Sequence, residues 1–199
     1  MSIHMKQKVP ENHPHGPENA EHELKKAYNS VIEASLVHFW DRKAIQGVNP
    51  YEVITLYRHA YDAYRRDDRL ASERWARSAK HLSRAFWHEA KIAFLEPRVT
   101  ELPFLENAEA EYSSTETYEL TTDLLESVSH HAPPGFSEMP EDMRRYILRG
   151  KKHLTVTQEA DYKNELLTVE RIKAAHEYAR VVECLGLAYE AESKKSKAA

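Results

Sequence analysis

Apolar side chains recur every third or fourth position along most of the chain, which is the spacing of one face of an α-helix. The pattern predicts three long helices, over residues 18–46, 68–96 and 158–192, with shorter helices between them. No segment alternates apolar and polar residues long enough to predict a strand, and only residues 152–156 suggest a brief extended segment. The expected fold class is therefore all-α, with five to six helices packed as a bundle or a short helical array.

Capping residues predict where two of the helices begin. Asn49 can cap a helix, Pro50 fits the first helical position, and Glu52 stands where a capping-box carboxylate would reach back. Asp67 or Asp68 can cap the next helix, where a carboxylate also meets the positive end of the helix dipole.

Glycine and proline predict where the helices end. Gly47 should stop the first long helix, and Pro97 should stop the second. Gly150 predicts the end of a short helix over residues 140–149, followed by a linker that runs through Thr157.

Length and composition favour one domain of a globular class. The chain has 199 residues, and we expect a single all-α domain over residues 19–192 between tails at residues 1–18 and 193–199. Five glycines are too few for glycine-rich phosphate loops. The one cysteine, Cys184, excludes an internal disulfide and predicts a buried apolar thiol. No apolar run approaches the ~20 residues of a membrane span, so we expect a cytoplasmic protein without a membrane partner.

Charge is distributed unevenly along the chain. The sequence holds 28 Lys and Arg against 32 Asp and Glu, a formal net charge of −4. Residues 99–142 contain 11 acidic residues and no Lys or Arg, whereas residues 58–98 contain 10 basic and 6 acidic ones. The acidic segment either lies across basic faces of its neighbours, which include Arg77, Arg84 and Lys91, or it offers an acidic surface to a basic partner.

The two arms of the hairpin predicted over residues 51–95 combine small and aromatic side chains. These are Leu56, Tyr57, Ala60, Tyr61 and Tyr64, then Ala71, Trp75 and Ala79. The hairpin resembles a tetratricopeptide-type repeat, which implies a helical scaffold that binds proteins through a concave aromatic face. An ordinary antiparallel helix pair with its aromatics in the core is the alternative. We expect a non-enzymatic protein-interaction or assembly module, with candidate partner-binding residues Tyr57, Tyr61, Tyr64, Arg77 and Arg84.

Arg74 and His81 carry a second hypothesis, of a catalytic kind. They share a helical stripe with His88, and their spacing resembles the Arg-x(4–6)-His motif of HEPN-type ribonucleases. That resemblance implies that histidine moves the 2′-hydroxyl proton of an RNA while arginine stabilises the phosphorane charge. Trp75 departs from the family, which prefers a small polar residue there. A HEPN-like RNA-binding or RNA-cleaving protein is thus the alternative function, and a solvated basic stripe is the structural one.

Two further features bear on the partner. The basic run over residues 144–153 could contact phosphates; a solvated short helix, or a surface that pairs with residues 99–142, is the alternative. No histidine follows a glutamate at the three-residue spacing of di-iron bundles, so we expect no metal and no cofactor. A protein partner is therefore expected before a nucleic acid, and self-association stays open.

Overall fold

All regular structure in the described part of the chain is helical. The structure, a computed structural model, describes residues 16–40, 49–98, 114–158 and 165–196. These residues contain six α-helices and no strand: α1 (Ala20–Trp40), α2 (Pro50–Arg65), α3 (Arg69–Leu95), α4 (Ser114–Ser129), α5 (Glu141–Gln158) and α6 (Glu165–Ser196). Single 3₁₀ turns at Pro17–Asn19 and Glu96–Arg98 flank the first three helices. The predicted all-α class is confirmed.

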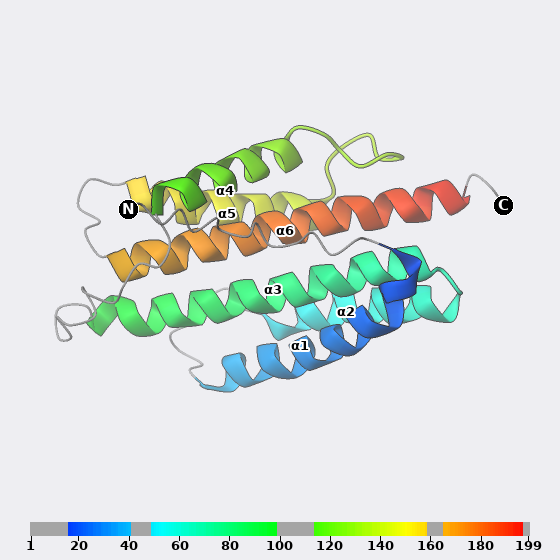
Figure 1. Ribbon diagram of the computed structural model, residues 1–199, viewed down its shortest axis with the longest axis horizontal. Helices are drawn as coiled ribbons and strands as arrows, with labels where there is room; N and C mark the ends of the chain where they lie inside the picture. The colour runs from blue at the N-terminus through cyan, green and yellow to red at the C-terminus, as the bar shows by residue number, and fades with distance from the viewer. Residues whose placement is uncertain (1–15, 41–48, 99–113, 159–164, 197–199) are drawn as a thin grey trace, which may run out of the picture.

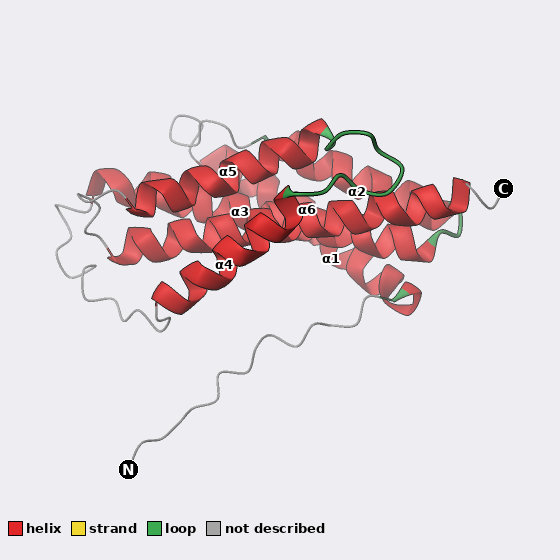
Figure 2. Ribbon diagram, turned by 90° about the horizontal axis from the view of Figure 1, so that it is seen from above, coloured by secondary structure: helices red, strands yellow, loops and turns green. Residues whose placement is uncertain are grey.

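The helices form two groups of three that meet along α3 and α6. Helices α1, α2 and α3 pack on one another, and α4 and α5 pack on α6 and on each other (Figure 1). Among the described helices, the contact between α3 and α6 is the most extensive. Seen from above, the long helices run roughly along one axis, so the molecule is elongated in that direction (Figure 2).

Helix α3 lies at the centre of the first group and contacts α1, α2 and α6. It is buried on most sides, and much of its surface is alanine, which lets neighbouring helices approach closely. Larger side chains, among them Trp75, Leu82 and Phe86, fill the space between the helices. Burial of such side chains contributes about 1.5–3 kcal/mol each to the stability of the core.

The predicted caps form at the starts of α2 and α3. The Asn49 side chain accepts a hydrogen bond from the backbone N–H of Tyr51 at 3.1 Å, and Asp68 accepts one from Ala71 at 3.2 Å. Glu52 does not complete a capping box, because its carboxylate accepts a hydrogen bond from the Tyr146 hydroxyl at 2.9 Å. The local cap is therefore confirmed, and the expected role of Glu52 is wrong.

The predicted end of α5 at Gly150 is wrong. The helix continues to Gln158, so the expected linker and the extended segment at residues 152–156 are helical instead. A Cβ atom at Gly150 would lie 3.0 Å from Leu125 Cδ2 on α4 and 3.5 Å from the Ala175 carbonyl oxygen on α6. This glycine therefore provides room for helix packing instead of stopping a helix.

Other predicted boundaries shift or fall outside the described residues. Helix α6 begins at Glu165 and runs to Ser196, four residues past the predicted end of the domain. Gly47 and residues 41–46, where the first helix was expected to end, are outside the described residues, as are residues 99–113 of the acidic segment. Within the described residues, no helix has an apolar stretch sufficient to cross a bilayer.

Candidate functional site

The three predicted tyrosines of α2 line one side of a shallow groove. Tyr57, Tyr61 and Tyr64 follow one another at four- and three-residue steps, so one face of the helix carries all three. Tyr28 joins them from the neighbouring helix α1. The groove has a volume of about 430 Å³, and we call it the tyrosine groove; its other lining residues are Glu21, Leu24, Lys25 and Asn29.

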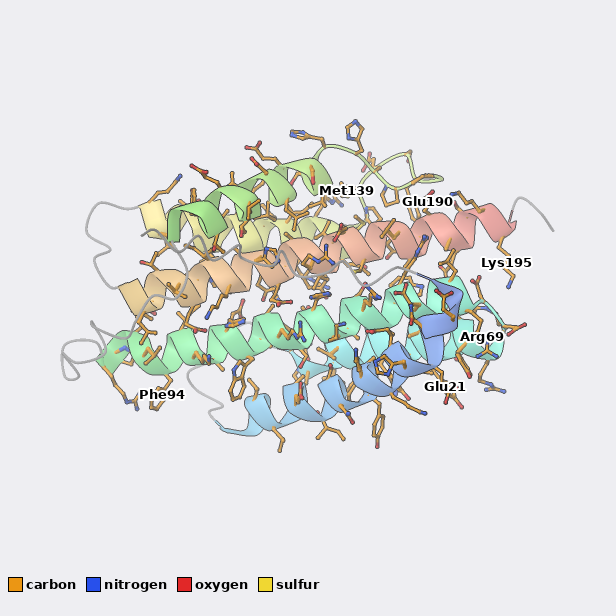
Figure 3. All side chains as sticks on the ribbon, in the orientation of Figure 1. Glu21, Arg69, Phe94, Met139, Glu190 and Lys195 are labelled. Atoms are coloured by element: carbon orange, nitrogen blue, oxygen red, sulfur yellow. The ribbon has the colours of Figure 1, made fainter. Side chains whose placement is uncertain are left out.

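The rings of the tyrosine groove contact one another across the two helices. The ring centroids of Tyr28 and Tyr57 are 5.9 Å apart and tilted, and those of Tyr57 and Tyr61 are 6.4 Å apart and stacked. The Arg69 guanidinium lies 3.8 Å from the centroid of Tyr64 and holds that ring at the end of the groove. Figure 3 shows Arg69 near Glu21, another residue that lines the groove, at one end of the molecule. The tyrosines are thus a preformed aromatic surface.

Helix α1 extends the apolar surface beyond the groove. Tyr28, Ile32 and Leu36 follow at four-residue steps, and 54%, 46% and 61% of their surfaces are exposed. Tyr61 on α2 is also exposed, at 46%. Large apolar side chains that gather on one face are typical of an interaction surface. We refer to these four residues together with Tyr57 and Tyr64 as the α1–α2 face.

Electrostatically the tyrosine groove is close to neutral. Lys25 Nζ and the Glu21 carboxylate form an ion pair at 2.8 Å, which cancels the two charges among the lining residues. Burial raises the pKa of Tyr57, so its hydroxyl stays protonated at neutral pH and can donate or accept a hydrogen bond. The groove therefore offers apolar ring surface and neutral polar groups.

Arg77 and Arg84, the two other predicted partner-binding residues, are not part of the α1–α2 face. Arg77 is buried and pairs with Glu73, one turn earlier on α3. Arg84 is half exposed and lies 3.9 Å from Glu177 on α6. The structure thus separates the predicted tyrosines from the predicted arginines.

The acidic segment does not cover these basic residues in its described part. Helix α4 packs on α5 and α6 instead of α3. The carboxylates beside the three named cations belong to α3 and α6: Glu73 for Arg77, Glu177 for Arg84 and Glu170 for Lys91. Helix α4 therefore does not lie across these cations, and residues 99–113 of the acidic segment lie outside the described residues.

Arg74 and His81, the candidate catalytic pair, both face α6. Arg74 Nη1 donates a hydrogen bond to the Leu187 carbonyl at 2.6 Å. His81 Nδ1 lies 2.6 Å from the Glu177 carboxylate, and since an ionised carboxylate only accepts, this ring nitrogen is the donor. Only 8% of the His81 surface is exposed. Both side chains thus hold α3 against α6.

The same arrangement repeats seven residues along α3. His88 Nδ1 lies 2.6 Å from Glu170, and Lys91 Nζ lies 3.4 Å from the same carboxylate. The later histidine of α3 contacts the earlier glutamate of α6, so the two helices are antiparallel. Seven residues are about two helical turns, so one histidine–glutamate contact recurs every two turns. We call this row of contacts the polar seam.

Burial and hydrogen bonding together set the protonation of the pair formed by His81 and Glu177. Burial lowers the pKa of His81, which keeps the ring neutral at pH 7. Burial acts to raise the pKa of Glu177, but the hydrogen bond from His81 and nearby positive charges outweigh it and lower that pKa. The result is a neutral imidazole that donates to an ionised carboxylate, a stabilising contact between helices.

A second, largely buried network, which no sequence pattern indicated, links four helices. The Tyr178 hydroxyl on α6 donates to Glu89 on α3 at 2.5 Å, and His153 Nε2 on α5 lies 3.4 Å from the same carboxylate. The Tyr146 ring stacks on Tyr178 with centroids 6.1 Å apart, and its hydroxyl donates to Glu52 on α2. These partners are 89 and 94 residues apart in sequence, so no local spacing could reveal them.

Within the described residues, no group of three or more His, Cys, Asp or Glu side chains could hold a metal ion. Cys184 is fully buried on α6, and burial raises the pKa of its thiol to about 12. That thiol is protonated at neutral pH and acts as a small apolar side chain, as predicted.

Comparison with known proteins finds no family model, no curated protein and no solved structure that matches this chain.

Proposed function

We propose that this protein is a non-enzymatic interaction or assembly module that binds a partner protein through the α1–α2 face. The observation that carries the proposal is the exposure of Tyr28, Ile32, Leu36 and Tyr61 beside a preformed tyrosine groove. Burying this surface against a partner removes apolar area from water, at about 25 cal/mol per Å² before the entropic cost of association.

Tyrosine suits such a surface because it combines a large ring with a polar hydroxyl and few rotatable bonds. Residues of this type are enriched among those that dominate binding energy at protein interfaces. The stacked contact between Tyr57 and Tyr61 and the tilted contact between Tyr28 and Tyr57 hold the rings before a partner arrives. A partner therefore loses less side-chain entropy in binding than it would against isolated tyrosines.

Charge favours a protein over a nucleic acid as the occupant of the tyrosine groove. Nucleic-acid affinity depends on cations that neutralise phosphates. The groove contains one lysine, Lys25, and Glu21 already neutralises it. The expected partner is thus an apolar segment of a protein whose flanking polar groups can bond to tyrosine hydroxyls.

Quantitative affinity purification from the native cell extract tests the proposal with matched substitutions. Leu36→Glu and Tyr61→Glu each place a charge on the α1–α2 face while keeping a good helix former. Leu120→Glu makes the same change at an exposed leucine on α4 and serves as the control. Proteins that bind this face should be recovered at least about tenfold less with the two test variants, which corresponds to about 1.4 kcal/mol.

The control variant should recover the same proteins as the unchanged protein, at low and at moderate salt. Sedimentation of the three variants checks the assembly form of the proposal, because a dimer through this face should dissociate with Tyr61→Glu and persist with Leu120→Glu. The proposal would be overturned if no bound protein and no self-association depended on Leu36 and Tyr61.

A further inference from the structure

One face of α5 carries a second groove, whose chemistry differs from that of the tyrosine groove. It has a volume of about 550 Å³ and is lined by Glu141, Arg144, Arg145, Leu148, Arg149 and Lys152. The residues follow at three- and four-residue steps, so they share one helical face. Four of these six side chains are cations and one is a carboxylate. We call this the cationic groove.

The charges of the cationic groove are only partly compensated within the molecule. Arg149 Nη2 and Arg145 Nη2 lie 3.4 Å and 3.9 Å from the Glu52 carboxylate on α2. Among the described residues, no carboxylate pairs with Arg144 or Lys152. Two cations at opposite ends of the groove are therefore available to an anionic partner.

An exposed apolar side chain lies between these two cations. Leu148 is 67% exposed, and it follows Arg144 by four residues and precedes Lys152 by four. At 1.5 Å per residue, the three Cα atoms span about 12 Å along the helix. A cation, a leucine and a cation therefore follow one another over about two turns.

We propose that the cationic groove binds an acidic segment of a partner protein, in which carboxylates flank an apolar side chain. The carboxylates would pair with Arg144 and Lys152, and the apolar side chain would pack on Leu148. A guanidinium matches a carboxylate with two parallel hydrogen bonds, so Arg144 also fixes the orientation of the segment. A 12 Å span fits about four residues of extended chain or about two turns of helix.

The residue at the centre of the groove favours a protein segment over a single-stranded nucleic acid. Surfaces that bind single strands combine cations with aromatic rings on which the bases stack. The central side chain here is leucine, and none of the six lining residues is aromatic. A leucine removes apolar area of a peptide side chain from water but offers no ring for stacking.

Fluorescence anisotropy with two labelled peptides and one RNA tests this proposal. The first peptide repeats the order Glu-Glu-Leu-Glu-Glu, the second replaces each leucine with serine, and the RNA is a single-stranded oligouridylate. Titrations at about 50 and about 300 mM NaCl separate the electrostatic part of binding, because the Debye length falls as salt rises. We expect the leucine-containing peptide to bind most tightly and to weaken at the higher salt.

Exposed substitutions then assign the binding to the cationic groove. Arg144→Glu and Leu148→Ser should each weaken binding of the leucine-containing peptide at least about tenfold. Arg58→Glu makes the same charge change as Arg144→Glu at an exposed position on α2 outside both grooves, and should leave the affinity within about twofold. Circular dichroism at 222 nm confirms that each variant is folded.

Four results would overturn the proposal. The first three are no peptide binding at the lower salt, equal losses with Arg58→Glu and Arg144→Glu, and tighter binding of the RNA than of the peptide. The fourth is equal affinity for the two peptides, which would remove the role of Leu148. Because none of these variants alters the α1–α2 face, the result is independent of the proposed function.

Discussion

Glu23 ties α1, which carries half of the α1–α2 face, to the central helix α3. Its side chain is almost fully buried, and its carboxylate accepts hydrogen bonds from Lys80 Nζ at 2.9 Å and Lys26 Nζ at 3.2 Å. Burial acts to raise the pKa of Glu23, but the two lysines outweigh it and lower the pKa from 4.5 to about 2. The substitution Glu23→Gln removes this charge and leaves Lys80 without its carboxylate.

The expected loss of stability follows from the size of the pKa shift. Each pKa unit corresponds to about 1.4 kcal/mol, so the lowering of the Glu23 pKa from 4.5 to about 2 stabilises the folded state by about 3 kcal/mol at pH 7. Because the pKa of Glu23 is lower in the folded state, this contribution is present above pH 4.5 and is lost as the pH falls toward 2. At pH 3, linkage leaves less than half of it.

Urea unfolding, followed by circular dichroism at 222 nm, measures the contribution of Glu23 to the free energy of unfolding at pH 7 and at pH 3. We expect Glu23→Gln to lower the free energy of unfolding by about 3 kcal/mol at pH 7 and by less than half as much at pH 3. Glu33→Gln removes an exposed carboxylate from the same helix and should change the free energy of unfolding by at most about 0.5 kcal/mol at either pH. A loss for Glu23→Gln that is small at pH 7, or that does not shrink at pH 3, would refute the reasoning.

Three further substitutions test other contacts by chemical or thermal unfolding. Tyr178→Phe should cost about 2 kcal/mol, because the partly buried Glu89 loses a hydrogen-bond donor; a neutral result would contradict the network. Gly150→Leu should cost at least about 2 kcal/mol, because Leu125 leaves no room, and a stabilised variant would refute that packing. Asp68→Ala should cost about 1 kcal/mol through its lost cap, whereas unchanged stability would deny the cap a role.

Local chemistry made the start of α2 predictable. Asn49 caps through its own side chain, and Pro50 fits the first turn without reference to any distant residue. The carboxylate of Glu52, in contrast, bonds to Tyr146, 94 residues away. The helix could be predicted from the sequence, and the role of its third residue could not, because the tertiary partner outweighs the local one.

Gly150 shows the same limit for a helix end. Glycine weakens a helix by about 1 kcal/mol relative to alanine and is common just past helix ends, which is why it indicated an end. The packing of α5 against Leu125 and Ala175 outweighs that cost. Only the neighbouring helices show that the small residue is needed for contact.

The candidate residues divide in the same way. The tyrosines of α2 lie on one face by helical spacing alone, so their convergence could be predicted. The addition of Tyr28 and Leu36 from α1 depends on how two helices pack, which the spacing within either helix does not determine. The charge count over residues 99–142 likewise predicted that this segment is negatively charged. It could not predict that the carboxylate beside Arg84 is Glu177 of α6.

Photo-crosslinking tests the binding role of the α1–α2 face most directly. A photoreactive phenylalanine analogue at Tyr61, at Leu36 and, for comparison, at Leu120 on α4 places the reactive group at exposed positions on two surfaces. Irradiation in the native cells should give the same discrete protein adduct at Tyr61 and at Leu36 and none at Leu120. Adducts of equal yield at all three positions, or none at Tyr61 and Leu36, would contradict the assignment of this face to a partner.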